Sequence, residues 1–197
     1  MKKITVILAF LFVICSGQLF SQAQKESVAP VKPALLVIDI QNQFLPMIPE
    51  RDRTMGLAYI NNYIDIFRSH GCPIIRIYHE GKEFGPKQGT DQFEFPTTVK
   101  ILPDDPKVIK NYPDGFNKTD LDKVLRENGC NTLFLVGLSA VGCVLATYIG
   151  ANNHDYKVFM IEDAIMSHDS DFTNQIENIF GAVNYDVVKI ILEQSGK

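Results

Sequence analysis

The sequence is poor in cysteine and has no cluster of basic residues. Only four of its 197 residues are cysteine, and 19 Lys and Arg residues are set against 23 Asp and Glu, for a formal net charge of −4. Because the positive charges are scattered, nucleic acid is not an expected partner. There is also no tandem repeat. Hydrophobic residues make up 46% of the chain, enough for one domain with a sizeable core.

The amino terminus has the pattern of a secretory signal. Lys2 and Lys3 precede an apolar stretch at residues 4–15, and residues 21–23 offer small side chains at the cleavage positions. We predict a signal peptide at residues 1–23, a linker at residues 24–32 and one domain at residues 33–197. The apolar stretch is short for a membrane span, although an uncleaved anchor is the alternative. The chain is therefore expected to be exported, periplasmic or secreted, with no stable membrane insertion after cleavage.

Cleavage would leave three cysteines, Cys72, Cys130 and Cys143. An odd number of thiols in an oxidising compartment leaves at least one free or paired between chains. The count therefore gives no disulfide scaffold, and it directs attention to a reactive thiol.

Short apolar runs alternate with segments of helical spacing from end to end. This alternation predicts an α/β fold, namely a three-layer, doubly wound, mainly parallel six-stranded sheet with helices on both faces. Residues 80–106 lack a clear period and are too long for a plain connection, which is typical of a lid or binding loop. The expected strands are residues 34–39, 73–78, 107–110, 132–136, 158–161 and 187–191, and the expected helices include residues 53–70, 141–152 and 172–180.

Polar groups lie at the carboxyl ends of several expected strands. Asp39 ends the first strand, Lys110 ends the third and Cys143 follows the fourth, whereas Cys72 and Cys130 precede strands. Ligands of open α/β sheets bind at the carboxyl edge, so Cys143 is the thiol on the expected side. Cys72 and Cys130 are interpreted as small buried hydrophobes. Taken singly, Asp39 could cap a turn, Lys110 could be a surface lysine and Cys143 a buried helix cysteine.

These residue types suit covalent catalysis. A thiol attacks as the thiolate, which a helix amino terminus and a nearby lysine would both favour. A neighbouring carboxylate can take the thiol proton and return it to the leaving group. The Gly-containing turn at residues 137–142 can direct backbone N–H groups at a developing oxyanion.

Four segments resemble the isochorismatase-like cysteine hydrolase family, which includes nicotinamidase-related amidases. The resemblance covers about residues 33–182. The segments are residues 36–44 (LVIDIQNQF), 110–116 (KNYPDGF), 137–147 (GLSAVGCVLAT) and 162–164 (EDA).

The resemblance implies a role for each matching residue. Asp39 would be the general base, Lys110 its cationic partner and Cys143 the nucleophile. The backbone amides of Ser139 and Cys143 would form the oxyanion hole, and the family's cis peptide would fall at Leu138–Ser139.

Nicotinamidases of the family bind a metal through an Asp-x-His pair and a further His. Here Ile77 stands where the Asp should be, and no second His follows His79 nearby. Isoleucine cannot ligate a metal, so we predict no metal site and no cofactor. His79, Phe44 and Phe116 are the predicted substrate-binding residues. The alternative is a pocket-lining or surface histidine for His79 and ordinary core or loop packing for the two phenylalanines. Other candidates for an aromatic pocket wall are Tyr78, Phe84, Phe93 and Phe95.

The function predicted from the sequence is hydrolysis of a small amide-like C–N substrate through a thioester on Cys143. The alternatives are vinyl-ether hydrolysis of the isochorismatase type without a covalent intermediate, and a non-catalytic binding protein on the same fold. The expected partner is a small-molecule substrate, and family analogy allows a homo-oligomer.

Overall fold

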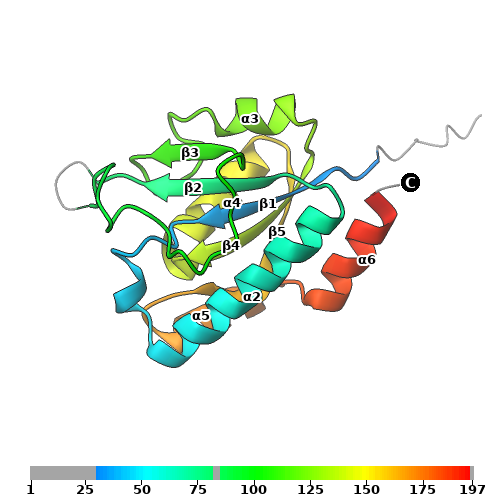
Figure 1. The fold of residues 1–197 in the computed structure, drawn as a ribbon. Helices are drawn as coiled ribbons and strands as arrows, with labels where there is room; N and C mark the ends of the chain where they lie inside the picture. The colour runs from blue at the N-terminus through cyan, green and yellow to red at the C-terminus, as the bar shows by residue number, and fades with distance from the viewer. Residues whose placement is uncertain (1–29, 82–84, 196–197) are drawn as a thin grey trace, which may run out of the picture. The chain divides into compact units, whose positions relative to one another are not determined.

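The computed structural model describes residues 30–81 and 85–195. The predicted signal peptide and most of the predicted linker lie outside this part of the chain. The described residues form a parallel five-stranded sheet with helices packed on it, which confirms the predicted α/β class (Figure 1). The strand order is β3-β2-β1-β4-β5, with β1 (Pro33–Ile38), β2 (Ile74–His79), β3 (Lys107–Lys110), β4 (Thr132–Leu138) and β5 (Lys157–Met166).

The two central strands are apolar throughout because helices cover both of their faces. Every residue of β1 and of β4 is buried. In the parallel register, Leu36 of β1 lies beside Ile75 of β2 and Leu135 of β4. Continuous apolar runs are what a parallel sheet buried on both sides requires.

Helices form a layer on each side of the sheet. On one face, α2 (Glu50–Ser69) packs Phe67 against Phe134 of β4, with ring centroids 5.3 Å apart. The helix α6 (Tyr185–Ser195) joins the same hydrophobic cluster through Val188 and Leu192. The opposite cluster takes residues from α3 (Leu121–Glu127), α4 (Leu145–Asn153) and α5 (Ser170–Phe180). Within the described ranges, no helix has the length and hydropathy needed to cross a bilayer.

The predicted sixth strand at residues 187–191 is wrong, because this segment lies in α6. Its β-branched residues suggested a strand, but burial follows a helical spacing. Val188 and Leu192 are buried, whereas Val187 and Ile190 are 40% and 54% exposed. Beyond β5, a single parallel bridge between Ile161 and Val183 extends the pairing.

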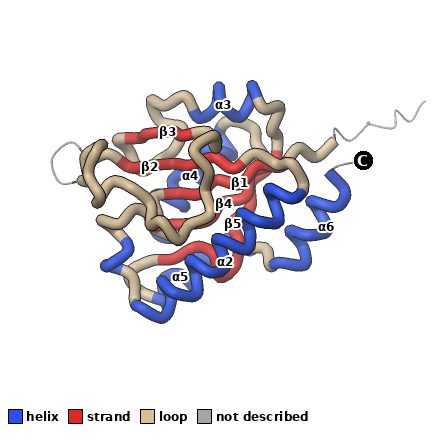
Figure 2. The backbone as a smooth tube through the Cα atoms, viewed as in Figure 1, coloured by secondary structure: helices blue, strands red, loops and turns tan. Residues whose placement is uncertain are grey.

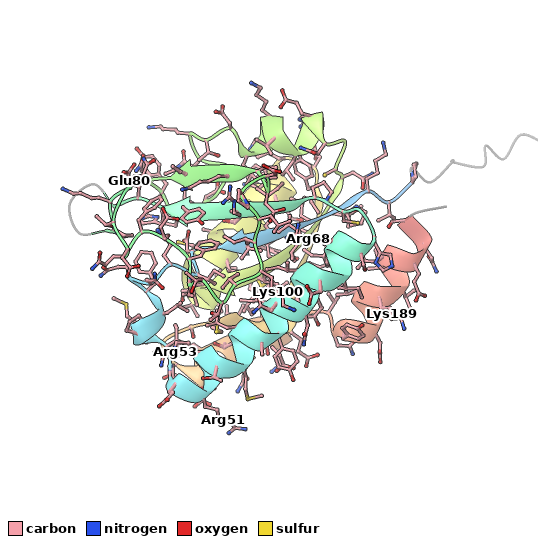
Figure 3. The ribbon with its side chains drawn as sticks, viewed as in Figure 1. Arg51, Arg53, Arg68, Glu80, Lys100 and Lys189 are labelled. Carbon is pink, nitrogen blue, oxygen red and sulfur yellow. The ribbon has the colours of Figure 1, made fainter. Side chains whose placement is uncertain are left out.

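The long connection between β2 and β3 lies over the same cluster as α2 (tan in Figure 2). Phe93 and Phe95 stack on Tyr78, with ring centroids 5.1 and 4.1 Å away. Arg68 of α2 donates hydrogen bonds to the Lys100 carbonyl and the Asp105 carboxylate, and Figure 3 shows Arg68 and Lys100 on these neighbouring segments. The described part of this connection is therefore packed into the domain.

Candidate active site

The strand order brings the predicted catalytic residues to one edge of the sheet. Asp39 follows β1, His79 ends β2, Lys110 ends β3, and Cys143 lies in the π-helical turn η2 (Ala140–Val144) that follows β4. These four strands are neighbours in the sheet. A carboxylate oxygen of Asp39, a ring nitrogen of His79 and Sγ of Cys143 all lie within 4.8 Å of one another.

The other two thiols lie away from this edge, as the sequence predicted. Cys72 precedes β2 and is half-buried, and Cys130 precedes β4 and is buried. Burial raises the pKa of both thiols, that of Cys130 to about 11. Neither is poised for attack on a ligand at the carboxyl edge.

Asp39 and Lys110 form a buried ion pair. Lys110 Nζ donates a 2.7 Å hydrogen bond to Asp39 Oδ2, and the two residues are only 1% and 3% exposed. The surface-lysine alternative for Lys110 is therefore wrong. Asp39 also has left-handed backbone geometry (φ +51°), an unusual conformation that is found more often for Asp and Asn than for other non-glycine residues. Such strained geometry is concentrated at functional sites.

His79 is the second side chain that contacts the Lys110 ammonium. Lys110 Nζ lies 3.2 Å from His79 Nδ1, and Phe44 packs edge-on against the imidazole at a centroid distance of 6.1 Å. Burial and the charge of Lys110 lower the pKa of His79, with Asp39 opposing them. The imidazole is therefore neutral at physiological pH.

Cys143 is held as a thiol rather than a thiolate. Burial and the negative charge of Asp39 raise its pKa to about 12, and the charge of Lys110 only partly opposes them. Lys110 favours the thiolate, as expected, but burial and Asp39 outweigh it in the resting site. Burial also raises the pKa of Asp39 against the influence of Lys110, which makes its carboxylate a stronger base. Asp39 Oδ1 is buried and has no hydrogen-bond partner among residues 30–81 and 85–195.

The turn between β4 and Cys143 has a tightly constrained backbone. The peptide bond Leu138–Ser139 is cis, as the family resemblance implied. The Ser139 carbonyl accepts hydrogen bonds from the amides of Gly142 (2.8 Å) and Val144 (3.1 Å). The start of the turn requires glycine at residue 137, because φ is +116° and an added Cβ would lie 2.1 Å from the Ile38 carbonyl oxygen. The oxyanion-hole role of the Ser139 and Cys143 amides stays a prediction.

A pocket of about 240 Å³ opens at this edge. Its size suits a small ligand, since pockets for drug-sized ligands measure roughly 300–1,000 Å³. It contains two of the three predicted substrate-binding residues, Phe44 and His79. The lining residues are Asp39, Phe44, His79, Leu138, Ser139, Gly142 and Cys143.

Phe116 is not part of this pocket, contrary to the prediction. Its ring stacks on His154 at 4.8 Å and packs against Tyr156 at 5.7 Å, in the hydrophobic cluster beneath α3 and α4. The preceding amide, that of Gly115, donates to Thr147 Oγ1 of α4 and holds this turn against the helix. Tyr78, Phe93 and Phe95 likewise serve the core, and Phe84 lies outside the described residues.

Gln41 is a site residue that the sequence reasoning did not single out. Its fully buried side chain donates to the carbonyls of His79 (3.0 Å) and Phe93 (2.9 Å), and its Oε1 accepts from the His79 amide (2.8 Å). It therefore ties the end of β2 and the long connection to the turn after β1. The only sequence signal was an amide side chain directly beyond a buried strand.

The donor set does not fit a divalent metal of the nicotinamidase type. Asp39, His79 and Cys143 could each present one ligand atom. However, the Lys110 ammonium already donates to Asp39 and lies against His79 Nδ1, and its charge would repel a cation. The Ile77 side chain is buried in the core and offers no ligand.

A doubly wound sheet that gathers an aspartate, a lysine and a cysteine at its carboxyl edge defines an isochorismatase-like cysteine hydrolase. Residues 33–184 match the isochorismatase domain, and the chain belongs to the isochorismatase family.

Relatives and solved structures agree with this assignment. An uncharacterised isochorismatase family protein of Bacillus subtilis, YddQ, is 32% identical over 142 residues, covering 66% of this chain and 76% of the relative. The structure of N-carbamoylsarcosine amidase from Thermoplasma acidophilum matches with a TM-score of 0.68 and 27% identity, over 78% of this chain and 95% of that one. The zinc-bound pyrazinamidase of Pyrococcus horikoshii matches with a TM-score of 0.68 and 26% identity, over 78% and 99%.

Proposed function

We propose that this family hydrolase is an amidase that cleaves a small, non-peptide C–N bond through a thioester on Cys143. The observation that carries the proposal is the buried Asp39–Lys110 pair, whose aspartate lines the same small pocket as Cys143. The amidases among the structural neighbours support the choice of a C–N bond.

The reaction begins with transfer of the Cys143 thiol proton to Asp39 as Sγ bonds to the substrate carbonyl carbon. Because the thiol pKa is about 12, this transfer accompanies attack and does not precede it. Lys110 supplies the positive charge that offsets the negative charge of the site while Asp39 takes up the proton. Collapse of the tetrahedral intermediate breaks the C–N bond, and Asp39 returns the proton to the leaving amine.

Hydrolysis of the thioester completes the cycle. Asp39 removes a proton from water as the water oxygen bonds to the acyl carbon. The C–S bond then breaks, and the proton returns to the Cys143 sulfur. The products are a carboxylic acid and an amine, or ammonia when the substrate is a primary amide.

The raised thiol pKa also favours a second candidate, direct hydrolysis by a water that Asp39 activates. This route forms no covalent intermediate, and it would suit vinyl-ether cleavage of the isochorismatase type. Cys143 would then only line the pocket.

Ammonia release from a panel of small amides, ureides and carbamoyl compounds separates the two routes. Wild-type protein is compared with Cys143→Ala and with Cys72→Ala, which removes a thiol outside the pocket. We expect release by wild type and Cys72→Ala, none by Cys143→Ala, and a hydroxylamine-sensitive acyl adduct on Cys143 by mass spectrometry. Release that survives Cys143→Ala overturns the covalent route in favour of the direct one.

We also propose that the protein is exported and acts outside the cytoplasm. Fractionation of cells that express the full chain, followed by sequencing of the mature amino terminus, tests this. The expected first residue is Gln24, and a full-length cytoplasmic product would contradict the proposal.

A further inference from the structure

The contact between Lys110 and His79 fixes where the imidazole carries its proton. An ammonium group has three N–H donors and no acceptor. Lys110 Nζ lies 3.2 Å from His79 Nδ1, so Nδ1 is the acceptor and carries no hydrogen. A neutral imidazole with an unprotonated Nδ1 must carry its hydrogen on Nε2.

The Nε2–H group has no hydrogen-bond partner among residues 30–81 and 85–195. The ring contacts Lys110 through Nδ1 and Phe44 through its edge, and His79 lines the pocket beside Asp39 and Cys143. With Nδ1 turned to the buried ammonium, Nε2 points to the other side of the ring. Among the described residues, His79 Nε2–H is therefore a donor at the pocket without a protein partner.

The position of His79 along the sheet edge separates this donor from the predicted oxyanion hole. His79 ends β2, Asp39 follows β1, and the Ser139 and Cys143 amides follow β4, in the strand order β2-β1-β4. Neighbouring strands lie about 4.8 Å apart. A carbonyl oxygen held by the predicted oxyanion hole lies on the β4 side of Asp39, so a donor on the β2 side is placed to meet a different substrate atom.

We propose that His79 Nε2–H is a specificity-determining donor that binds an uncharged hydrogen-bond acceptor on the acyl part of the substrate. This inference rests on the proposed function. A contact to the acyl part persists in the thioester after the amine has left, so it holds the substrate through both half-reactions. The apolar walls at Phe44 and Leu138 favour a neutral acceptor, such as an ether or carbonyl oxygen or a ring nitrogen. The substrate class is thus small amides with such an acceptor beside the scissile carbonyl.

Two isosteric amides test the preference, since 2-methoxyacetamide carries an ether oxygen where butyramide carries a methylene. We expect wild-type kcat/KM to favour 2-methoxyacetamide by roughly tenfold, the effect of one well-formed hydrogen bond. His79→Gln places an amide donor near the Nε2 position and should keep the preference at a lower rate. His79→Asn places an acceptor near Nδ1 without a donor at Nε2, and it should lose the preference. Equal turnover of the two amides by wild type overturns the proposal.

Nitrogen NMR of histidine-labelled protein gives a second readout that needs no turnover. The His79 signal, assigned by its loss in His79→Gln, should show a neutral ring with hydrogen on Nε2 at pH 7. An Nδ1–H or doubly protonated ring overturns the proposal. Failure to hydrolyse any amide counts against the proposed function alone. In that case the Nε2–H resonance of Cys143→Ala should respond to 2-methoxyacetamide and not to butyramide, and an equal response overturns the inference.

Discussion

Asp114 Oδ1 lies where a side chain on Gly150 would have to go, because a Cβ added at Gly150 would be 2.3 Å from it. The same oxygen accepts a 2.8 Å hydrogen bond from the Phe116 amide. The segment that follows Lys110 is thus seated directly on α4, the helix that follows Cys143. Docking of this segment couples the positions of the cation and the thiol.

Gly150→Ala is expected to destabilise the protein despite the higher helix propensity of alanine. Propensity alone would favour the variant by about 1 kcal/mol. The clash with Asp114 reverses the sign, for a net loss of about 1–3 kcal/mol in the free energy of unfolding. In an Asp114→Ala background the clash is absent, and the same change should stabilise. Urea unfolding of the wild type, the two single variants and the double variant checks this. Additive effects of the two substitutions would show that Gly150 and Asp114 are not in tight contact.

Removing one member of the buried Asp39–Lys110 pair should cost more than removing both. Lys110→Met leaves a buried carboxylate without its partner, a loss of about 3–5 kcal/mol in unfolding free energy. Adding Asp39→Asn removes the unpaired charge and should recover part of that loss, although neither variant is expected to be active.

The exposed pair of Lys100 and Asp65 provides the control for this prediction. Lys100→Met should change the unfolding free energy by less than about 1 kcal/mol, because solvent screens the pair. A similar cost for Lys100→Met and Lys110→Met would contradict a special role for burial.

Alkylation of Cys143 by iodoacetamide should be slow at pH 7 and accelerate above pH 9, because the thiol pKa is about 12. The charge of Asp39 contributes to the raised pKa of the Cys143 thiol. Asp39→Asn should therefore lower that pKa and speed alkylation at pH 8. The rates are measured by peptide mass mapping in a Cys72→Ala, Cys130→Ala background. Fast alkylation of the wild-type site at pH 7 would mean that the resting residue is a thiolate.

Glu177 should make stability depend on pH. Burial raises the pKa of its carboxyl to about 7, although the Asp163 amide donates a 2.9 Å hydrogen bond to Oε1. A carboxyl with a raised folded pKa contributes its stability below the unfolded pKa of about 4.3 and loses it as pH rises through 7. Glu177→Gln keeps the acceptor without the charge. It should be more stable than wild type by about 1–2 kcal/mol at pH 8, after discounting for partial exposure, with no such gain at pH 4.

Thermal unfolding at pH 4 and pH 8 measures this difference. The exposed residue Glu193, paired with Lys189 on α6, offers the matched control. Glu193→Gln should show no comparable change between the two pH values, and an equal response would assign the effect to net charge.

The sequence was most informative where burial is continuous. The apolar runs at β1 and β4 could be assigned because both faces of these strands are covered, and their carboxyl ends located Asp39 and Cys143. It was least informative at residues 187–191, where β-branched side chains suit a strand but the buried pair Val188 and Leu192 is spaced for a helix. Tertiary packing, and not strand propensity, determines the helical conformation of that segment.

Other parts of the site depend on contacts between distant segments. Burial of Lys110 requires a carboxylate 71 residues away. Whether Phe116 faces the pocket or the core depends on how its turn docks on α4. The thiol pKa is a balance of opposing effects, in which burial and Asp39 outweigh Lys110, and their relative size depends on distances that the sequence does not specify.

The single amide of Gln41 limits how far the long connection can be redesigned. It anchors the long connection through the Phe93 carbonyl while holding His79 at the sheet edge. The base, the cation and the nucleophile all come from strand ends or the turn after β4, and none comes from that connection. Redesign of residues 85–106 would therefore have to keep the Phe93 carbonyl and the apolar side chains against Tyr78. Loss of these contacts would shift His79 at the sheet edge even though no catalytic residue had been changed.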